Sequence, residues 1–332
     1  MGKIRVAING FGRIGRVFTR AIQENSNIEL VAINDLSDTV TLAHLLKYDS
    51  VHRGFNGTVT ATDNDIVING KAVKVFNERD PENLPWIDMN IDIVVEATGI
   101  FRTKELASKH IKAGAKKVIL SAPAKEDGIR TVVMGINDDL IDGTEEIISN
   151  ASCTTNCAAP MVKIIDELCG IQNGYITTIH SYTGDQRLHD APHSDLRRAR
   201  AAAESIVPTT TGAAKAITKI FPHLHGHMGG VGIRVPVPDG SLTDITCIVK
   251  NPVSAEELNK VFKEYANGAL KGVMEYIDDP IVSTDIIGNT HSVIYDSKLT
   301  SVIGNMIKVV GWYDNEAGYS NRIVDLIEKI HA

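Results

Sequence analysis

The sequence of 332 residues contains no apolar run approaching the roughly 18 residues of a membrane-spanning helix. It also lacks an excess of positive charge, because 34 lysines and arginines stand against 41 aspartates and glutamates, a formal net charge of -7. Proteins that charge alone attracts to nucleic acid or anionic membranes carry the opposite sign. We therefore expect no membrane insertion and no nucleic-acid binding as a main role, and any anionic ligand must be bound at a local site.

Cysteine is also scarce. The chain has 4 cysteines, without the dense spacing that marks a disulfide scaffold. The N-terminus becomes polar within a few residues, unlike a secretory signal. These features favour a cytoplasmic protein with reduced thiols. Cys153 and Cys157 lie one helical turn apart, but further ligands at suitable spacing are missing, so no metal site is expected.

The composition that remains is that of a globular protein, with 43% hydrophobic and 23% charged residues. The length suggests about two domains of roughly 150 residues each. The first half alternates strand-like and helical patterns, which predicts an α/β domain with a mostly parallel sheet. We expect strands at Lys3–Asn9, Ile28–Ile33, Asp92–Glu96, Lys117–Leu120, Thr131–Met134 and Glu146–Ser149, helices at Arg16–Glu24, Asp38–Lys47 and Lys104–Lys112, and a hairpin about Asn69-Gly70 over Asp65–Phe76.

After Cys153 the pattern changes to longer strands separated by fewer helices, which predicts an α+β domain. One of its helices has a capping box, formed by Ser254 and Glu257, and stops at Gly268. We expect strands at Tyr175–Ser181, Thr243–Lys250 and Met306–Tyr313, and helices at 153–169, Glu256–Asn267 and Asn315–His331.

A glycine-rich turn, GFGRIG (Gly10–Gly15), joins the first expected strand to the first helix. Backbone amides and the positive end of a helix face any anion bound at such a turn. Asp35 ends the second strand 20 residues after Gly15, where dinucleotide sites carry the carboxylate that binds the adenosine ribose diol. The pattern indicates dinucleotide binding, and it favours NAD over NADP because a carboxylate repels a 2′-phosphate. The alternative is that the glycines serve only tight packing.

Cys153 lies in the segment SNASCTTNC, between the last strand of the first half and the next helix, so it falls at the helix N-terminus. The helix dipole and the amides of the first turn stabilise a thiolate there, and they predict a thiol pKa lowered from about 8.5 into or below the neutral range. Cys169 and Cys247 have apolar neighbours and are interpreted as small buried hydrophobic residues. Cys153 is therefore the candidate nucleophile.

A thiol nucleophile needs a base, and the sequence has 11 histidines from which to choose. His180 ends a strand-like run, where its side chain can project from a rigid element into a cleft. Position alone leaves the other histidines open as alternatives. The group His223, His225 and His227 is interpreted as a surface loop rather than as a metal site.

These residues belong to longer motifs, by which the chain resembles the phosphorylating glyceraldehyde-3-phosphate dehydrogenase family along nearly its whole length. The motifs are INGFGRIGR (Ile8–Arg16), VEATGIF (Val95–Phe101), SAPAK (Ser121–Lys125), SNASCTTNCAAP (Ser149–Pro160), HSYTGDQRLHD (His180–Asp190), PTTTGAAKA (Pro208–Ala216), RVPVP (Arg234–Pro238) and YDNEAGYSNR (Tyr313–Arg322).

The resemblance implies roles for individual residues. Cys153 would be the nucleophile and His180 its base. The phosphate-holding positions would be Ser152, Thr154, Thr183, Asp185, Thr211, Gly212 and Arg234. The cofactor would be bound by Gly10, Phe11, Gly12, Arg13, Ile14, Gly15, Asp35, Arg79, Thr98, Gly99, Ser121, Asn315 and Tyr319, with Arg79 near the adenine and Asn315 on the nicotinamide carboxamide.

The fold implied is α/β, with a Rossmann-type doubly wound, mostly parallel sheet that binds NAD and a second α+β catalytic domain. The first would comprise residues 1–152 and 315–332, and the second residues 153–314. The activity implied is oxidation of glyceraldehyde 3-phosphate with NAD and inorganic phosphate to 1,3-bisphosphoglycerate, a step of glycolysis and gluconeogenesis, through a cysteine thiohemiacetal and a thioester. The family's homotetramer is implied too, with the loop between Ser181 and Pro208 packing across subunits.

Two alternative functions stay open at this point. An erythrose-4-phosphate dehydrogenase resembles this family in fold and nucleophile but releases its acid to water. A non-catalytic NAD-binding regulatory protein would keep the cofactor domain and lose the chemistry. The cluster of Arg197, Arg198 and Arg200 is interpreted as a set of subunit contacts rather than as a nucleic-acid surface.

Overall fold

A computed structural model describes residues 2–331. Met1 and Ala332, the first and last residues of the predicted cofactor-binding domain, lie outside the described residues. The chain forms two compact units. The first contains the residues up to Val132, Asp139–Ala151 and the residues from Ser320 onward, and the second contains Val133–Asp138 and Ser152–Tyr319. Within residues 2–331, none of the helices has both the length and the apolarity required to cross a membrane.

The first unit is built on a sheet of 9 strands in the order β3-β4-β5-β2-β1-β6-β7-β9-β8. Its strands are β1 (Ile4–Asn9), β2 (Ile28–Asn34), β3 (Val59–Ala61), β4 (Asp65–Ile68), β5 (Lys71–Phe76), β6 (Ile93–Glu96), β7 (Lys117–Leu120), β8 (Arg130–Thr131) and β9 (Ile147–Ser149). Its helices are α1 (Arg13–Ala21), α2 (Thr39–Lys47), α3 (Lys104–Lys112) and most of α7 (Ala317–His331).

Parallel pairing dominates this sheet, as the sequence predicted. Strands β2, β1, β6, β7 and β9 are all parallel to their neighbours, and only the β3-β4-β5 edge is antiparallel. Val6, Ala7 and Ile8 in the central strand β1 are fully buried, because both faces of such a sheet are covered. The parallel strands therefore end together at one edge, where ligands bind in folds of this class.

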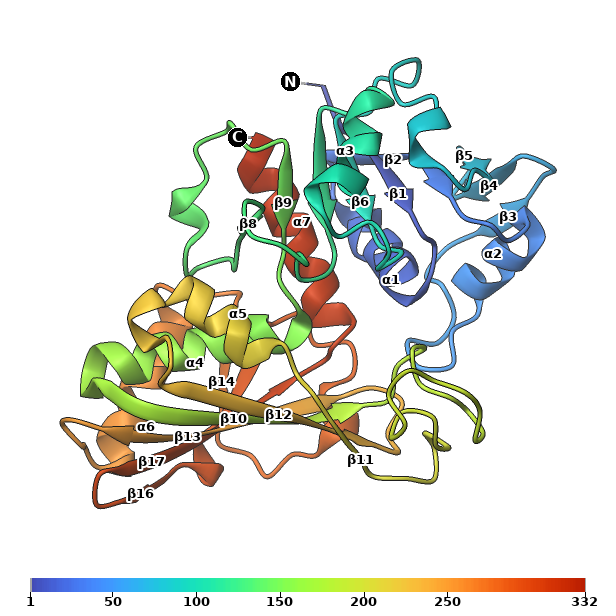
Figure 1. The fold of residues 1–332 in the computed structure, drawn as a ribbon. Coiled ribbons are helices and arrows are strands. Elements are labelled where there is room, and N and C mark those ends of the chain that lie inside the picture. The colour runs from blue at the N-terminus through green and yellow to red at the C-terminus, as the bar shows by residue number, and fades with distance from the viewer. Residues whose placement is uncertain (1, 332) are drawn as a thin grey trace. The chain divides into compact units, whose positions relative to one another are not determined.

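The second unit is built on a sheet of 8 strands in the order β11-β12-β10-β13-β17-β15-β14, with β16 paired to β17. Helix α4 packs against β10, β13 and β17, and α5 packs beside α4 over β12 (Figure 1). The strands are β10 (Ile171–Ser181), β11 (Val207–Thr209), β12 (Met228–Val235), β13 (Ser241–Val249), β14 (Met274–Ile277), β15 (Val293–Asp296), β16 (Ser301–Ile303) and β17 (Met306–Tyr313), and the helices are α4 (Cys153–Cys169), α5 (Ala213–Ile220) and α6 (Ala255–Asn267).

Short 3-10 helices complete the described chain. They are Ile22–Glu24, Pro81–Asn83, Asp138–Leu140, Pro222–Leu224, Ser283–Ile286 and Ser297–Leu299.

Local sequence signals explain many of the boundaries. Asn69 and Gly70 both have positive φ, 50° and 79°, which is the conformation of the tight hairpin turn expected between β4 and β5. The Ser254 hydroxyl accepts a hydrogen bond from the amide of Glu257 at the start of α6, as the capping box predicted. The bounds of α3, β7 and β17 coincide with the predicted ranges.

Several predicted boundaries are wrong, most of them by one or two residues, and β10 begins at Ile171 rather than Tyr175. Two of the differences have a clear local cause. The strand expected at Thr131–Met134 ends at Thr131, because the side chain of Asn137 accepts the amide proton of Val133 and folds the chain into a turn. The first helix begins at Arg13 rather than Arg16, inside the glycine motif, because Gly12 adopts an extended conformation that caps the helix.

The glycines at the start of α1 differ in the space around them. A Cβ on Gly15 would lie 2.5 Å from the carbonyl oxygen of Gly10, whereas a Cβ on Gly12 would meet nothing within 4 Å. We predict that Gly15→Ala lowers the free energy of unfolding by about 1–3 kcal/mol through overpacking. Gly12→Ala should change it by less than about 0.5 kcal/mol. Urea unfolding of both variants measures this, and equal losses in the two would contradict the close-approach argument.

Candidate active site

The glycine turn and Asp35 are brought together at the edge of the first unit's sheet. The carboxylate of Asp35 accepts a hydrogen bond of 2.8 Å from the amide of Phe11 and another of 2.9 Å from the amide of Ser37. Gly10 has a φ of 93° and lies so close to the backbone of Thr98 that a Cβ would be 2.8 Å from its nitrogen. The open space beside Gly12 and the absence of a side-chain cap on α1 leave room for an anion at the helix N-terminus.

The other cofactor positions expected in this unit lie along the same edge. Thr98 and Gly99 follow β6, and Ser121 follows β7, with its amide donating to the carbonyl of Glu96. Arg13 makes an ion pair of 2.6 Å with Asp49, whose pKa is lowered to about 2 by the Arg13 side chain and the amides of His52 and Val51 against the opposing effect of burial. Ile14 is partly buried in the first turn of α1, and Arg79 is exposed.

A buried polar network that the sequence analysis missed lies beneath this edge. Both oxygens of the Glu96 carboxylate are occupied: one accepts from the amide and the hydroxyl of Thr98, and the other accepts from Asn9 at 2.6 Å and His110 at 3.1 Å. Trp86 can only donate, and it donates to Nδ1 of His110, so His110 presents an Nε2–H group to Glu96. The network fixes the Thr98 backbone. In the sequence, the network is indicated only by the polar residues Asn9 and Glu96, which end β1 and β6.

Cys153 is the first residue of α4, as predicted. The chain reaches it through Ala151, which has a φ of 56°, an uncommon conformation for a residue with a Cβ and one that is often found at functional sites. The hydroxyl of Ser152 caps α4 by accepting from the amide of Thr155 at 3.1 Å. The Cys153 side chain is thereby placed at the N-terminus of a helix of 17 residues.

His180 and Arg234 are neighbours because their strands pair. Strands β10 and β12 are parallel, and His180 lies directly opposite Arg234 in their register. Nε2 of His180 lies 3.5 Å from the sulfur of Cys153, and Nδ1 lies 2.8 Å from a terminal guanidinium nitrogen of Arg234. The second unit therefore assembles a thiol, an imidazole and a guanidinium from α4, β10 and β12.

Two of the expected phosphate-holding positions, Thr183 and Asp185, lie near these three residues. Asp185 accepts from the hydroxyl of Thr183 and forms an ion pair with Arg198. Arg198 also donates to the hydroxyl of Thr209 at 3.0 Å. The sequence predicts subunit contacts for Arg198; within its own chain the side chain, 20% exposed, pairs with Asp185 and Thr209. Arg198 is therefore a second cation near His180 and Arg234, and its place in the sequence gave no sign of this.

Hydroxyl groups line the rest of the site. Thr154 and Thr178 both hydrogen-bond to the hydroxyl of Tyr313, at 2.9 and 2.8 Å, and the Tyr313 ring stands edge-on to His180. Burial raises the pKa of Tyr313, so its hydroxyl keeps its proton. The remaining phosphate positions, Thr211 and Gly212, lie at the N-terminus of α5, where the Thr211 hydroxyl accepts from the amide of Ala213.

Two serine hydroxyls orient the side chain of Asn315, the residue expected at the nicotinamide. The side-chain oxygen of Asn315 accepts hydrogen bonds from Ser181 at 2.8 Å and from Ser241 at 2.7 Å. The side-chain NH₂ group of Asn315 can therefore donate hydrogen bonds to a carbonyl oxygen of a ligand. Tyr319, another expected cofactor position, is buried within α7.

The protonation states differ from the sequence-based expectation. Burial raises the pKa of the Cys153 thiol, and it outweighs the opposing effects of the Arg234 charge and the helix amide of Thr154. The expectation of a thiol pKa in or below the neutral range is therefore wrong for the unliganded chain. Burial, with Arg234 beside it, lowers the pKa of His180 to about 3, so both groups are neutral at pH 7.

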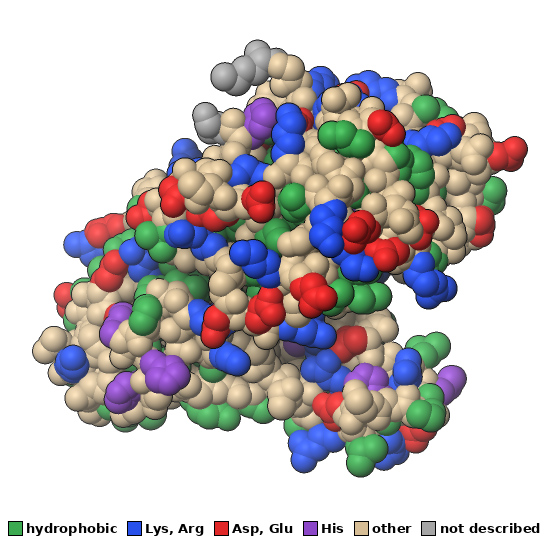
Figure 2. All heavy atoms as spheres, turned by 45° about the horizontal axis from the view of Figure 1, so that its top comes forward, with side chains coloured by type: hydrophobic (Ala, Val, Ile, Leu, Met, Phe, Trp, Pro, Cys, Tyr) green, Lys and Arg blue, Asp and Glu red, His purple; other side chains and the backbone are tan. Residues whose placement is uncertain are grey.

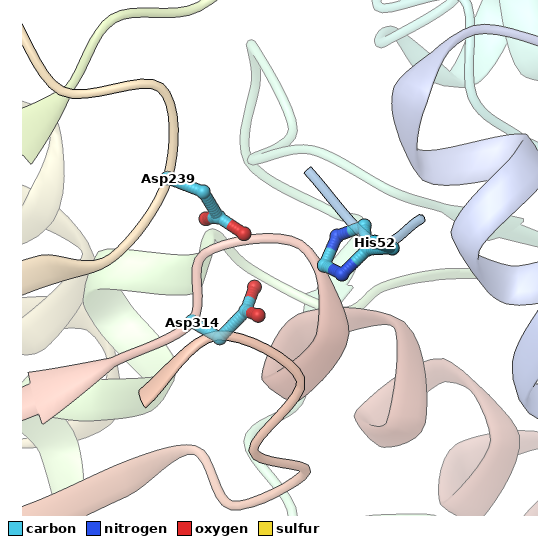
Figure 3. A group of neighbouring side chains, drawn as sticks. All are labelled: His52, Asp239 and Asp314. Carbon is cyan, nitrogen blue, oxygen red and sulfur yellow. The ribbon is translucent and has the colours of Figure 1, made fainter. Parts of the chain in front are cut away.

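Two carboxyl groups, Asp239 and Asp314, face each other from separate loops of the second unit (Figure 3). Asp314 accepts hydrogen bonds from the amides of Gly288, Glu316 and Ala317, all within 2.8 Å, which fix the position of its carboxylate. Burial, together with the charges of Asp314 and Glu316, raises the pKa of Asp239 to about 9. Asp239 is therefore protonated at pH 7. The turn that contains Asn315 is held by the hydrogen bonds to its neighbour Asp314.

This pair predicts a pH-dependent stability. Between about pH 4 and pH 9 the folded state binds the Asp239 proton and the unfolded state does not, so the contribution of Asp239 to stability falls as the pH rises. We predict that the melting temperature of Asp239→Asn, relative to wild type, increases steadily from pH 4.5 to pH 8.5. The control Asp195→Asn should show a difference from wild type that stays nearly constant above about pH 5, because hydrogen bonds from Thr209 and the Arg197 amide lower the pKa of Asp195 and this carboxyl is ionised in both the folded and the unfolded state there. A difference for Asp239→Asn that is independent of pH would contradict the raised pKa of Asp239.

Comparisons with known proteins agree with this geometry. Residues 4–104 match the family model of the glyceraldehyde 3-phosphate dehydrogenase NAD binding domain, and residues 152–315 match that of the C-terminal domain of the same enzymes. The glyceraldehyde-3-phosphate dehydrogenase of Thermotoga maritima is 58% identical over 327 residues, 98% of each chain. Those of Geobacillus stearothermophilus and Streptomyces avermitilis (glyceraldehyde-3-phosphate dehydrogenase 2) are 55% identical over 97% of each chain. The chain therefore belongs to the glyceraldehyde-3-phosphate dehydrogenase family.

Proposed function

We propose that this protein oxidises glyceraldehyde 3-phosphate with NAD and inorganic phosphate, forming 1,3-bisphosphoglycerate. The observation that carries the proposal is the 3.5 Å approach of the Cys153 sulfur to Nε2 of His180, with Arg234 on the other ring nitrogen. This group joins a nucleophile, a proton acceptor and an anion-binding cation. The names of the relatives support the same reaction.

The residues of the glycine turn fit NAD. Gly12 leaves space at the α1 N-terminus for a pyrophosphate, and the oriented carboxylate of Asp35 suits a ribose diol. Phe11, Arg13 and Ile14 would lie beside the pyrophosphate, with Thr98, Gly99 and Ser121 along the same edge. Arg79 would lie near the adenine, and Asn315 and Tyr319 at the nicotinamide end. When bound, NAD supplies the acceptor for the hydride that leaves the substrate carbon.

Cys153 begins the reaction by adding its sulfur to the aldehyde carbon, which forms a thiohemiacetal. His180 takes up a proton at Nε2 as the sulfur or the hemiacetal oxygen loses it, a contribution of typically about 10² to 10⁴ in rate. Oxidation at the same carbon leaves an acyl thioester on Cys153. An oxygen of inorganic phosphate then attacks the thioester carbonyl, the carbon–sulfur bond breaks, and Cys153 regains its thiol.

Two phosphate groups must be held during this sequence, one belonging to the substrate and one to the attacking anion. Arg234 and Arg198 supply the cations, since a guanidinium binds phosphate with two parallel hydrogen bonds and stays charged at neutral pH. The hydroxyls of Ser152, Thr154, Thr183 and Thr211, the amide of Gly212 and the carboxylate of Asp185, which orients Arg198, complete the proposed phosphate positions.

We propose separate roles for the two parts of the chain. Residues 1–152 and 315–332 would serve the cofactor, and residues 153–314 the chemistry. We infer a homotetramer in the cytoplasm, where the free state of all four cysteines is maintained. Acidic and basic side chains are mixed on the face drawn in Figure 2, which favours small-molecule ligands over a nucleic-acid partner.

A steady-state assay tests the proposal. With glyceraldehyde 3-phosphate and NAD, reduced cofactor should form continuously only when inorganic phosphate is present, because phosphate must release the acyl group from Cys153. Cys153→Ser should abolish turnover, and Cys157→Ala, which removes the buried thiol one helical turn away, should retain it. Sustained turnover without phosphate, or a preference for erythrose 4-phosphate, would contradict the proposal.

A further inference from the structure

Three polar residues lie side by side at the carboxyl ends of neighbouring strands in the first unit. In the register of the sheet, Asn34 of β2 is opposite Asn9 of β1, and Asn9 is opposite Glu96 of β6. All three are buried. Buried polar groups are costly unless they are hydrogen-bonded, so the partners of this row show what it holds in place.

The main chain of Glu78 fixes the direction of the hydrogen bonds along the row. The amide of Glu78 donates to the side-chain oxygen of Asn34 at 2.9 Å, and the carbonyl of Glu78 accepts from the side-chain nitrogen at 2.9 Å. A backbone amide can only donate and a backbone carbonyl can only accept, so the Asn34 amide has one orientation. The second N–H of this nitrogen donates to the side-chain oxygen of Asn9 at 2.7 Å, and the Asn9 nitrogen donates to Glu96 at 2.6 Å.

The other end of the row is also anchored on the main chain. The second oxygen of the Glu96 carboxylate accepts from the amide of Thr98 at 2.8 Å. The row is therefore a continuous chain of hydrogen bonds from the backbone of Glu78 to the backbone of Thr98, across three strands. Its middle is joined to the glycine turn, because the amide of Gly10 donates to the carbonyl of Asn34 at 2.8 Å.

The residues of this chain of hydrogen bonds lie next to positions that are proposed to bind NAD. These positions are Gly10 directly after Asn9, Asp35 directly after Asn34, Arg79 directly after Glu78, and Thr98 two residues after Glu96. The hydrogen bonds thus connect four segments that are distant in sequence and that would all contact the same cofactor.

We propose that Asn9, Asn34 and Glu96 are positioning residues that hold these NAD-binding segments at fixed distances from one another. The inference rests on the proposed function, since it takes the neighbouring residues as the cofactor positions. NAD is long enough to contact several segments at once, so its affinity depends on how well their relative positions are set before it binds. The row acts on the cofactor through the backbone of the residues that bind it.

Glu96→Gln interrupts the row with little change in shape. The carboxylate accepts with both oxygens, whereas a glutamine side chain has one oxygen and one NH₂ group. Whichever way this side chain turns, its NH₂ group faces a donor, either the amide of Thr98 or the side-chain nitrogen of Asn9. One of these two donors therefore loses its acceptor, and the connection between the segments is broken.

Asp92 offers a matched control at the opposite edge of the same part of the sheet. One oxygen of its carboxylate accepts from the amide of Arg5 at 2.8 Å, and the other accepts from the Lys116 side chain at 2.8 Å. Asp92→Asn therefore also replaces a carboxylate that accepts from one backbone amide and one side chain. It does so at the amino ends of β1 and β6, away from the proposed cofactor positions.

The test measures the dissociation constants of NAD and ADP-ribose by calorimetry in the full-length protein. Glu96→Gln should raise both about tenfold, because a buried donor loses its partner beside the segments that bind the part common to both ligands. Asp92→Asn should change neither by more than about twofold. In steady-state assays of Glu96→Gln, KM for NAD should rise while kcat at saturating NAD stays within about twofold of wild type, because the reacting groups lie in the second unit.

A second variant tests whether the row acts as one chain. Asn34→Ala should also weaken the binding of both ligands. The double variant, Glu96→Gln with Asn34→Ala, should weaken it by less than the product of the two single effects, because both changes break the same connection. Single effects that simply multiply would contradict a continuous row.

The other outcomes separate the inference from the proposed function. Unchanged affinities in Glu96→Gln, or an equal loss in Asp92→Asn, overturn the inference and leave the proposed function standing if turnover still depends on phosphate. Failure of Glu96→Gln to fold also overturns the inference, since the row would then serve folding rather than cofactor affinity. Wild type that binds neither NAD nor ADP-ribose overturns the proposed cofactor positions as well.

Discussion

The parallel pairing of β10 with β12 is the constraint on which the chemistry of the second unit depends. It sets His180 opposite Arg234 through the backbone register of the two strands. Helix α4 packs on the same sheet and presents Cys153 to the other side of the imidazole. Three elements distant in sequence thus fix three reactive groups, and the loop between β10 and β11 adds Arg198 beside them.

In both units, hydrogen bonds to buried carboxyl groups stabilise the edges that are proposed to bind ligands. In the first unit the Glu96 carboxylate receives hydrogen bonds at both oxygens, which allows a buried charge to hold the Thr98 backbone. In the second unit the Asp314 carboxylate accepts hydrogen bonds from the amides of Glu316 and Ala317, which follow Asn315, beside the protonated carboxyl group of Asp239. The positions proposed to bind ligand are therefore supported by groups that have no direct part in the proposed reaction. Removing one hydrogen-bond partner from these groups leaves the other buried and unpaired.

Much of the fold was predictable because its signals are local. The Asn69-Gly70 turn, the Ser254 cap and the start of α4 at Cys153 follow from neighbouring residues. The turn after Thr131 was not predictable from periodicity, since side chains further along the sequence compete for the backbone amides. The thiol pKa was wrongly predicted for a similar reason: the helix N-terminus is visible in the sequence, whereas the burial that outweighs it depends on tertiary packing. The position of Arg198 beside Asp185 likewise depends on tertiary packing, which the sequence pattern does not show.

The central claim is that oxidation passes through an acyl group bound to Cys153. The most direct test is to mix the protein with NAD and glyceraldehyde 3-phosphate in the absence of inorganic phosphate, quench it in acid and analyse the peptides by mass spectrometry. The account predicts one phosphoglyceroyl group per chain on the Cys153 peptide, which disappears when phosphate is added before the quench. Formation of reduced cofactor without an acyl group on Cys153, or with one on another residue, would contradict it.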